Sequence, residues 1–193
     1  MGWTGKGMDP EVLTTTLMGV IEQALAKMNS VTATDAPQIK TIDIVEYQNR
    51  MRVTGMEKFN APSFVSIANY YLTPSDMEKH RAKGALVLYV DLENAGKLFK
   101  ALGFTVPEDE DDSSMMDING EFCGLLVAAF KSELVRLGYV DLVVGGPHNY
   151  KNSVMEGVEY SPDQQNKLEF SFFYWKRKAI VVELTLAAIP LKK

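Results

Sequence analysis

The segment MMDINGEFCGLLVAAFKSELVRLG, residues 115–138, carries the strongest helical pattern in the chain. Its apolar residues recur every three or four positions, which predicts a helix from Met115 to Leu137 that ends at Gly138. One side of this helix is expected to pack on the core: Ile118, Phe122, Leu125, Leu126, Ala129 and Phe130, with Leu134 and Leu137 beyond them. Another side carries a stripe that is polar at its start and small at its centre: Asp117, Glu121, Gly124, Ala128 and Lys131.

Gly124 is unusual in the middle of this stripe, because an interior helical glycine costs about 1 kcal/mol relative to alanine. Two interpretations stay open. Another backbone could pack closely against Gly124 and Ala128. Alternatively, the two small residues could form a shallow notch where a partner protein approaches the helix.

Further elements are predicted on both sides of this helix. Asp9 and Pro10 begin an amphipathic helix that ends near Asn29, and Asp91 can cap a second one from Leu92 to Leu102. Strands are expected within 39–55 and at 64–68, 85–90, 139–144, 168–175 and 179–189. Most connections between them are too short for helical crossovers, so the sequence predicts an α/β (α+β) fold with a largely antiparallel sheet and long helices packed against it. We expect one domain over residues 1–193, with 1–8 a candidate disordered tail.

The charge is concentrated in one place. Net charge is −5, and Glu108–Asp112 is a run of five acids, so the rest of the chain has 20 acids and 20 bases. Without a basic stripe, nucleic-acid binding is not expected. We interpret the run as a solvated loop or as an acidic approach to the long helix, with Ser113 or Ser114 as N-cap. No apolar run reaches the 18–20 residues of a membrane span, and we expect a cytoplasmic protein.

Motifs for self-contained chemistry are missing. His80 and His148 have no partner at metal-ligand spacing, so no metal site is expected. The stretch GGPHNY, residues 145–150, is interpreted as a turn, because it lacks the Lys-Ser/Thr sequel of a phosphate loop. Cys123, the single cysteine, lies among apolar residues, which is typical of a buried inert thiol.

The stretch from Asp117 to Leu142 resembles the signature helix of CheX-like chemotaxis phosphatases, a family related to CheC and FliY. The order of the expected elements is similar too: an N-terminal helix, strands, a strand–helix unit at 84–103, the acidic loop, the long helix and a final hairpin. Gly146-Pro147 falls where the family has a strand leading into a proline loop. The resemblance runs through residues 60–190 and is specific over 115–150. It implies a single CheC/CheX-like domain.

The resemblance implies a function in hydrolysing the aspartyl phosphate of a CheY-type response regulator. The family motif is Glu-x-x-Asn: the glutamate pairs with the regulator's lysine, and the asparagine amide holds the attacking water. Glu121 stands at the glutamate position, but Gly124 stands at the asparagine position. The magnesium belongs to the regulator, so no cofactor is expected here. A literal Glu46-x-x-Asn49 lies in a strand-like stretch, and Asn119 points to another side of the helix, so neither replaces the missing amide.

Three hypotheses follow. The first is a divergent CheX-like domain that binds a phosphorylated CheY-like receiver through the stripe, with weak or no phosphatase activity because Gly124 lacks an amide. The second is an active phosphatase in which another group positions the water. The third is a structural or small-ligand domain that shares only the fold. Whether the chain is an enzyme therefore stays open.

A homodimer is also predicted, on two grounds. Relatives in the family pair through their sheets, which is implied by the resemblance alone. In addition, aromatic residues crowd both faces of one strand, at Phe170, Phe172, Phe173, Tyr174 and Trp175. If no helix covers one of those faces, it forms an apolar patch of the kind that marks interfaces.

Overall fold

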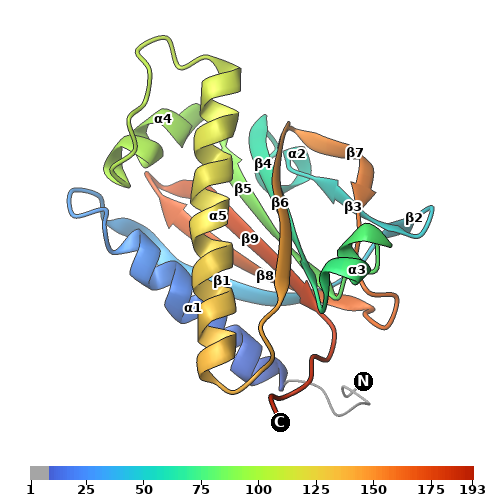
Figure 1. Cartoon of the computed structure of the whole chain (residues 1–193). Helices are drawn as coiled ribbons and strands as arrows, with labels where there is room; N and C mark the ends of the chain where they lie inside the picture. The colour runs from blue at the N-terminus through green and yellow to red at the C-terminus, as the bar shows by residue number, and fades with distance from the viewer. Residues whose placement is uncertain (1–8) are drawn as a thin grey trace.

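The computed structural model describes residues 9–193, so the predicted tail at 1–8 lies outside the described residues (Figure 1). Within them, an antiparallel sheet runs in the order β1-β8-β9-β5-β4-β6. Its strands are β1 (Ala33–Asp43), β4 (Ser63–Tyr71), β5 (Gly84–Asp91), β6 (Val143–Lys151), β8 (Asn166–Tyr174) and β9 (Arg177–Leu186). The prediction of an α/β fold with a largely antiparallel sheet is confirmed.

Three helices cover one face of this sheet: α1 (Pro10–Leu25), α4 (Leu92–Ala101) and α5 (Asp112–Arg136). Helix α5 runs the length of the molecule, with α1 crossing beside it (Figure 1). Alternate residues of the central strands, such as Leu88 and Val182, form the main core with Phe122 and Phe130 of α5. All four side chains are at most 2% exposed, so α5 is held firmly against the sheet.

A second, smaller sheet covers the opposite face. It runs in the order β2-β3-β7 and consists of β2 (Glu46–Tyr47), β3 (Arg50–Thr54) and β7 (Ser153–Val158). Its residues Met51 and Val53 pack on Val65, Val87 and other main-sheet residues whose side chains alternate with those of the main core. Two short helices, α2 (Met56–Phe59) and α3 (Pro74–Glu78), flank this layer. None of the helices in residues 9–193 is long and apolar enough to cross a membrane.

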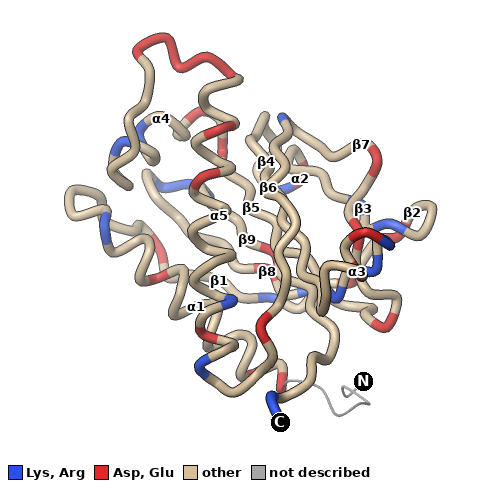
Figure 2. The backbone as a smooth tube through the Cα atoms, in the orientation of Figure 1, with Lys and Arg blue, Asp and Glu red and all other residues tan. Residues whose placement is uncertain are grey.

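Helix α5 begins earlier than predicted, and its N-cap comes from the acidic run itself. The carboxylate of Asp111 accepts a hydrogen bond from the backbone N–H of Ser114 at 2.9 Å, so the predicted caps Ser113 and Ser114 lie inside the helix. Hydrogen bonding by the side chain of Ser114, together with this backbone bond, lowers the pKa of Asp111. The acidic residues form the loop that joins α4 to α5 in Figure 2. All five acids are exposed, so the run is a solvated loop and, at Asp111, also an acidic approach to a helix start.

The turn predicted at 145–150 is wrong. These residues belong to β6, which pairs with β4 from Val143 to Lys151 with a register shift opposite Ile67 and Asn69. Tyr139, predicted to begin a strand, makes only an isolated bridge to Leu191. Gly145, Gly146 and Pro147 hide the alternation of side chains by which a strand is detected, although the pairing itself tolerates them at this sheet edge.

The aromatic strand is covered rather than exposed. Phe170, Phe172 and Tyr174 belong to the main core and are 0%, 3% and 6% exposed, while Phe173 and Trp175 are half-buried. The chain reverses at Trp175-Lys176, where both residues have positive φ. The apolar patch considered as a ground for a dimer is therefore not found on this face, and the dimer prediction rests on the resemblance alone.

Candidate functional site

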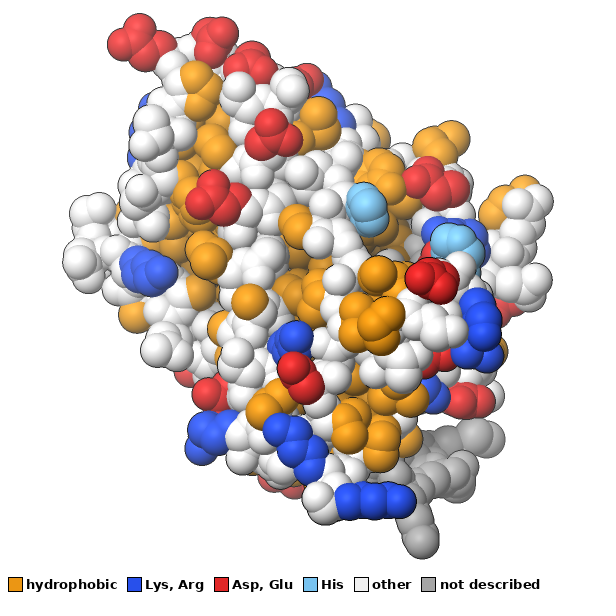
Figure 3. Space-filling model, viewed as in Figure 1, with side chains coloured by type: hydrophobic (Ala, Val, Ile, Leu, Met, Phe, Trp, Pro, Cys, Tyr) orange, Lys and Arg blue, Asp and Glu red, His pale blue; other side chains and the backbone are white. Residues whose placement is uncertain are grey.

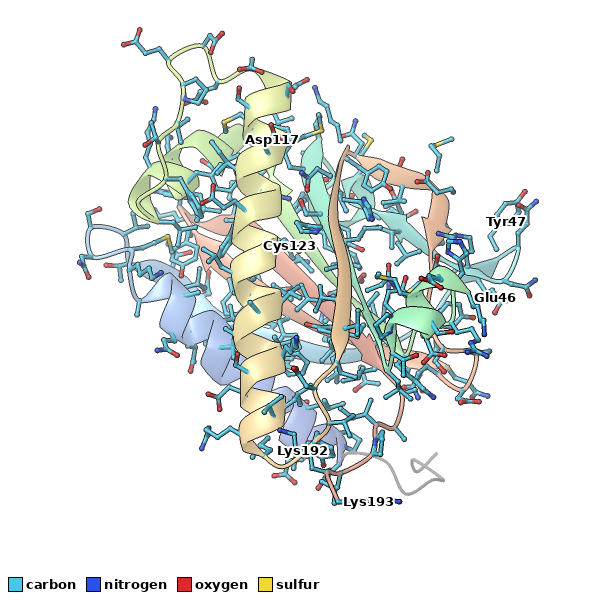
Figure 4. All side chains as sticks on the ribbon, in the orientation of Figure 1. Glu46, Tyr47, Asp117, Cys123, Lys192 and Lys193 are labelled. Atoms are coloured by element: carbon cyan, nitrogen blue, oxygen red, sulfur yellow. The ribbon has the colours of Figure 1, made fainter. Side chains whose placement is uncertain are left out.

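The predicted stripe lies along the outward side of helix α5. Asp117, Glu121 and Ala128 are exposed, and Gly124 and Lys131 are half-buried beside them. Figure 4 labels Asp117 near the beginning of the helix and Cys123 at its middle. The helix faces the viewer in Figure 3, with acidic side chains along its upper half. The five residues therefore share one accessible surface, called the α5 stripe below.

Strand β6 runs beside the α5 stripe and is tied to the helix at both ends. Near the beginning of α5, the Asp112 carboxylate pairs with Lys151, the last residue of β6. Toward the end of α5, Lys131 Nζ lies 3.1 Å from Oδ1 of Asp141, a residue just before β6. Lys131 was predicted to contact a partner, but its ammonium group is already paired within the chain. The exposed negative charge of the stripe therefore comes from Asp117 and Glu121.

Gly124 leaves an open position in the stripe. A Cβ atom placed on Gly124 would meet only Pro147 of β6, at 3.9 Å from Cγ and 4.0 Å from Cδ. These are ordinary van der Waals distances, so no backbone packs closely here. Of the two interpretations of this glycine, the notch is the one that agrees with the structure.

Close packing occurs instead at Gly120, one turn earlier. A Cβ there would lie 2.5 Å from Nδ2 and 2.7 Å from Cγ of Asn149, a residue of β6. Sequence reasoning did not single out either residue. A glycine four positions before Gly124 was the available signal, but the residue that it accommodates lies on a segment that had been assigned to a turn.

The inward side of the helix holds the two residues that had been set aside. Asn119 is completely buried, and its Nδ2 donates a hydrogen bond to Ser66 Oγ of β4 at 2.8 Å. It faces the sheet and cannot supply an amide to the stripe. Cys123 is also completely buried, and burial raises the pKa of its thiol to about 12. The prediction of a buried, unreactive thiol therefore agrees with the structure.

Three residues predicted for the core lie at the margin of the helix instead. Leu125 is 49% exposed and Leu137 is 41% exposed, and Ala129 is exposed as well. The sheet and the neighbouring helices contact only part of the circumference of α5, and these residues lie where that contact ends. Leu125 therefore adds an apolar surface next to the α5 stripe.

The remaining candidates lie elsewhere. Glu46 of the literal Glu-x-x-Asn sequence belongs to β2 and accepts a hydrogen bond from Tyr160, while Asn49 lies in the β2–β3 turn with φ 61°. Figure 4 shows Glu46 on the small sheet, on the other side of the molecule from α5. His80 pairs with Glu159 at 2.7 Å, and His148 is exposed on β6. Among the described residues, no group of three or more His, Cys, Asp or Glu side chains could hold a metal ion.

Comparison with known proteins gives a fold. The chain matches no protein-family model and no curated protein sequence. It is similar in structure to a CheC-like superfamily protein from Shewanella sp. PV-4, with 15% identity over 92% of this chain and 97% of that chain and a TM-score of 0.54. It is also similar to FliY from Thermotoga maritima (12% identity, 93% and 91% covered, TM-score 0.53) and to the chemotaxis protein CheX from Vibrio vulnificus (12%, 90% and 97%, 0.50). The chain has the fold that these proteins share, as the resemblance predicted.

Proposed function

We propose that this protein binds a phosphorylated CheY-type receiver domain through the α5 stripe, in chemotaxis or another two-component pathway. In this proposal it has weak phospho-aspartate phosphatase activity or none. The main observation behind this proposal is that Glu121 is exposed on α5, while Gly124, three residues later, has no side chain and leaves an open position. The fold shared with CheC-like, CheX and FliY proteins supports the proposal.

Glu121 is suited to recognise a receiver's lysine. Its carboxylate makes no ion pair with the described residues, and Asp117 lies one turn before it on the same side. The exposed side chains of Ala128 and Leu125 beside it are apolar, and that of Ala128 is small, so a partner's surface can approach closely. A charge-assisted hydrogen bond between carboxylate and ammonium would then orient the partner's active site toward Gly124.

The open position at Gly124 bears on turnover rather than on binding. The transition state of phosphoryl transfer is loose, so catalysis depends on positioning the water and stabilising charge. Loss of one such positioning group typically costs about 100- to 1000-fold in rate. We therefore expect binding to be retained and hydrolysis to be slow.

An active phosphatase is the second candidate. It requires a side-chain amide close to Glu121 from another residue, because Gly124 has none. The observation that favours it is the carboxamide of Asn149, which lies against Gly120.

The experiment compares wild type with Gly124→Asn, using a CheY-type receiver domain phosphorylated on its aspartate. We expect Gly124→Asn to raise the rate of dephosphorylation by about 100-fold or more, because the open position admits the new side chain. Ala129→Asn is the matched control: it puts the same amide on an exposed position of α5 outside the stripe, and we expect no change. Equal rates for wild type and Gly124→Asn would contradict the impaired-site proposal.

Binding is measured separately, with the same receiver activated by beryllofluoride. Glu121→Ala is expected to weaken the complex by roughly 10- to 100-fold, the contribution of a charged hydrogen bond. If wild type binds no activated receiver, the domain shares only the fold with these proteins. If Glu121→Ala binds as well as wild type, the receiver does not dock through Glu121.

A further inference from the structure

A chain of hydrogen bonds beneath the α5 stripe holds one amide in a defined orientation. Ser66 Oγ accepts from Asn119 Nδ2 at 2.8 Å and donates to Asn149 Oδ1 at 2.8 Å. Ser66 and Asn119 are both completely buried, whereas Asn149 is half-buried at the surface between α5 and β6. The oxygen of the Asn149 carboxamide therefore faces inward, toward Ser66.

The nitrogen of the same carboxamide is not used inside the protein. No hydrogen bond to the described residues engages Asn149 Nδ2, although its oxygen is fully placed by Ser66. The whole carboxamide lies against helix α5: a Cβ on residue 120 would collide with its oxygen as well as with its nitrogen, which would be 2.5 Å away. The N–H groups of this half-buried side chain are therefore left unpaired between α5 and β6, beside the residue that precedes Glu121.

Gly120 makes this placement possible. Any larger residue would collide with the Asn149 carboxamide, so the helix carries a glycine in its interior, where glycine is otherwise unfavourable. Gly120 and Gly124 are four residues apart and thus lie on the same side of the helix. The amide from β6 and the empty position on α5 are neighbours on one surface, with Pro147 and Asn149 of β6 contacting successive turns.

We propose that the weak hydrolytic activity comes from Asn149, whose carboxamide orients the water in place of the side chain that Gly124 lacks. The inference rests on the proposed function and specifies the source of its hydrolytic activity. An N–H of Asn149 donates to the attacking water and directs its lone pair at phosphorus. The water oxygen bonds to phosphorus as the bond from phosphorus to the aspartyl oxygen breaks. The electron pair of that bond stays on the receiver's carboxylate, and both protons of the water leave with the phosphate product.

The test measures dephosphorylation of a phosphorylated CheY-type receiver by the full chain and its variants. Wild type is expected to accelerate the decay weakly, and Asn149→Ala to remove this weak acceleration. Asn149→Asp can still accept the Ser66 hydrogen bond but has no N–H, so it should lose the same activity without loss of structure. His148→Ala changes the exposed neighbouring residue on β6 and should act like wild type.

Two further measurements separate a chemical role of Asn149 from a structural one. The dissociation constant for the beryllofluoride-activated receiver should change by less than about three-fold in Asn149→Ala, which adds no charge and leaves Glu121 unaffected. Adding Gly124→Asn to Asn149→Ala should restore hydrolysis, because it returns an amide to the same surface.

The outcomes distinguish this inference from the proposed function. If wild type binds the activated receiver but does not speed hydrolysis, or if Asn149→Ala hydrolyses as fast as wild type, the role of Asn149 is overturned and receiver binding stands. If wild type binds no activated receiver, the proposed function fails and the inference fails with it.

Discussion

At the scale of single residues, Gly120 and Gly124 predict opposite effects for the same substitution. Gly124→Ala adds a Cβ at ordinary contact distance from Pro147 and removes an interior helical glycine, so it should raise the free energy of unfolding by up to about 1 kcal/mol. Gly120→Ala forces the Asn149 carboxamide aside, and such overpacking costs about 1–3 kcal/mol. Urea denaturation of the two variants beside wild type measures both values.

The double variant provides the control for this comparison. With Asn149→Ala in place the obstacle at residue 120 is gone, so Gly120→Ala should then become neutral or stabilising. A Gly120→Ala variant as stable as Gly124→Ala in the wild-type background would show that Asn149 does not occupy this position.

At the scale of elements, a charged cluster ties helix α2 to the main sheet. Lys58 of α2 lies 2.5 Å from Glu169 of β8 and 2.5 Å from Glu183 of β9. Lys167 lies 2.8 Å from the second oxygen of Glu183, to which Tyr89 also donates at 2.6 Å. Glu183 is 1% exposed, so it is stable as an anion only because these partners surround it.

This cluster predicts a loss of stability in acid. Burial alone would raise the pKa of Glu183, but Lys167 and Lys58 lower it below its ordinary value of 4.5. A carboxyl whose pKa is lower in the folded state stabilises the fold above its unfolded pKa and ceases to do so as the pH falls through the folded pKa. The free energy of unfolding should therefore drop below about pH 4.5. Denaturation curves at several pH values measure this dependence.

Glu183→Gln tests the assignment. It should lower the free energy of unfolding at neutral pH by about 3–5 kcal/mol, because it leaves buried lysine charge uncompensated. It should also make the decline in acid shallower. Glu57→Gln, which breaks the exposed pair between Arg52 and Glu57, is the control and should cost less than about 1 kcal/mol. Parallel pH profiles for wild type and Glu183→Gln would contradict the role of Glu183.

At the scale of the whole molecule, the sequence predicts those elements whose buried residues follow a pattern within the element itself. The helix at 115–137 was found because its apolar residues recur every three or four positions, and the strand at 85–90 because it is a continuous apolar run. Strand β6 was missed because its conformation at Gly145–Pro147 is imposed by pairing with β4, a tertiary contact. The packing of Asn149 against Gly120 was missed for the same reason, since no local pattern brings these two residues together.

The two free edges of the main sheet bear on the predicted dimer. Within residues 9–193, strands β1 and β6 each pair on one side only, and edge strands offer unpaired backbone groups to a second chain. Of the two, β6 borders α5 and is partly occupied by its contacts, whereas ten of the eleven residues of β1 are exposed. A dimer formed through a sheet would therefore use β1. Pro37 of β1 lacks a backbone N–H and would limit the length of any such pairing.

Light scattering at increasing concentration tests this arrangement. If the chains pair through β1, the measured mass should approach twice the 21.5 kDa of one chain. Ile39→Pro should then restore the monomer, because a second proline in β1 would interrupt the edge. Met155→Ser is the control: it alters an 86%-exposed residue on the small sheet and should leave the mass unchanged. A monomeric mass at the highest concentration would rule out the dimer, and each free molecule would then carry one α5 stripe.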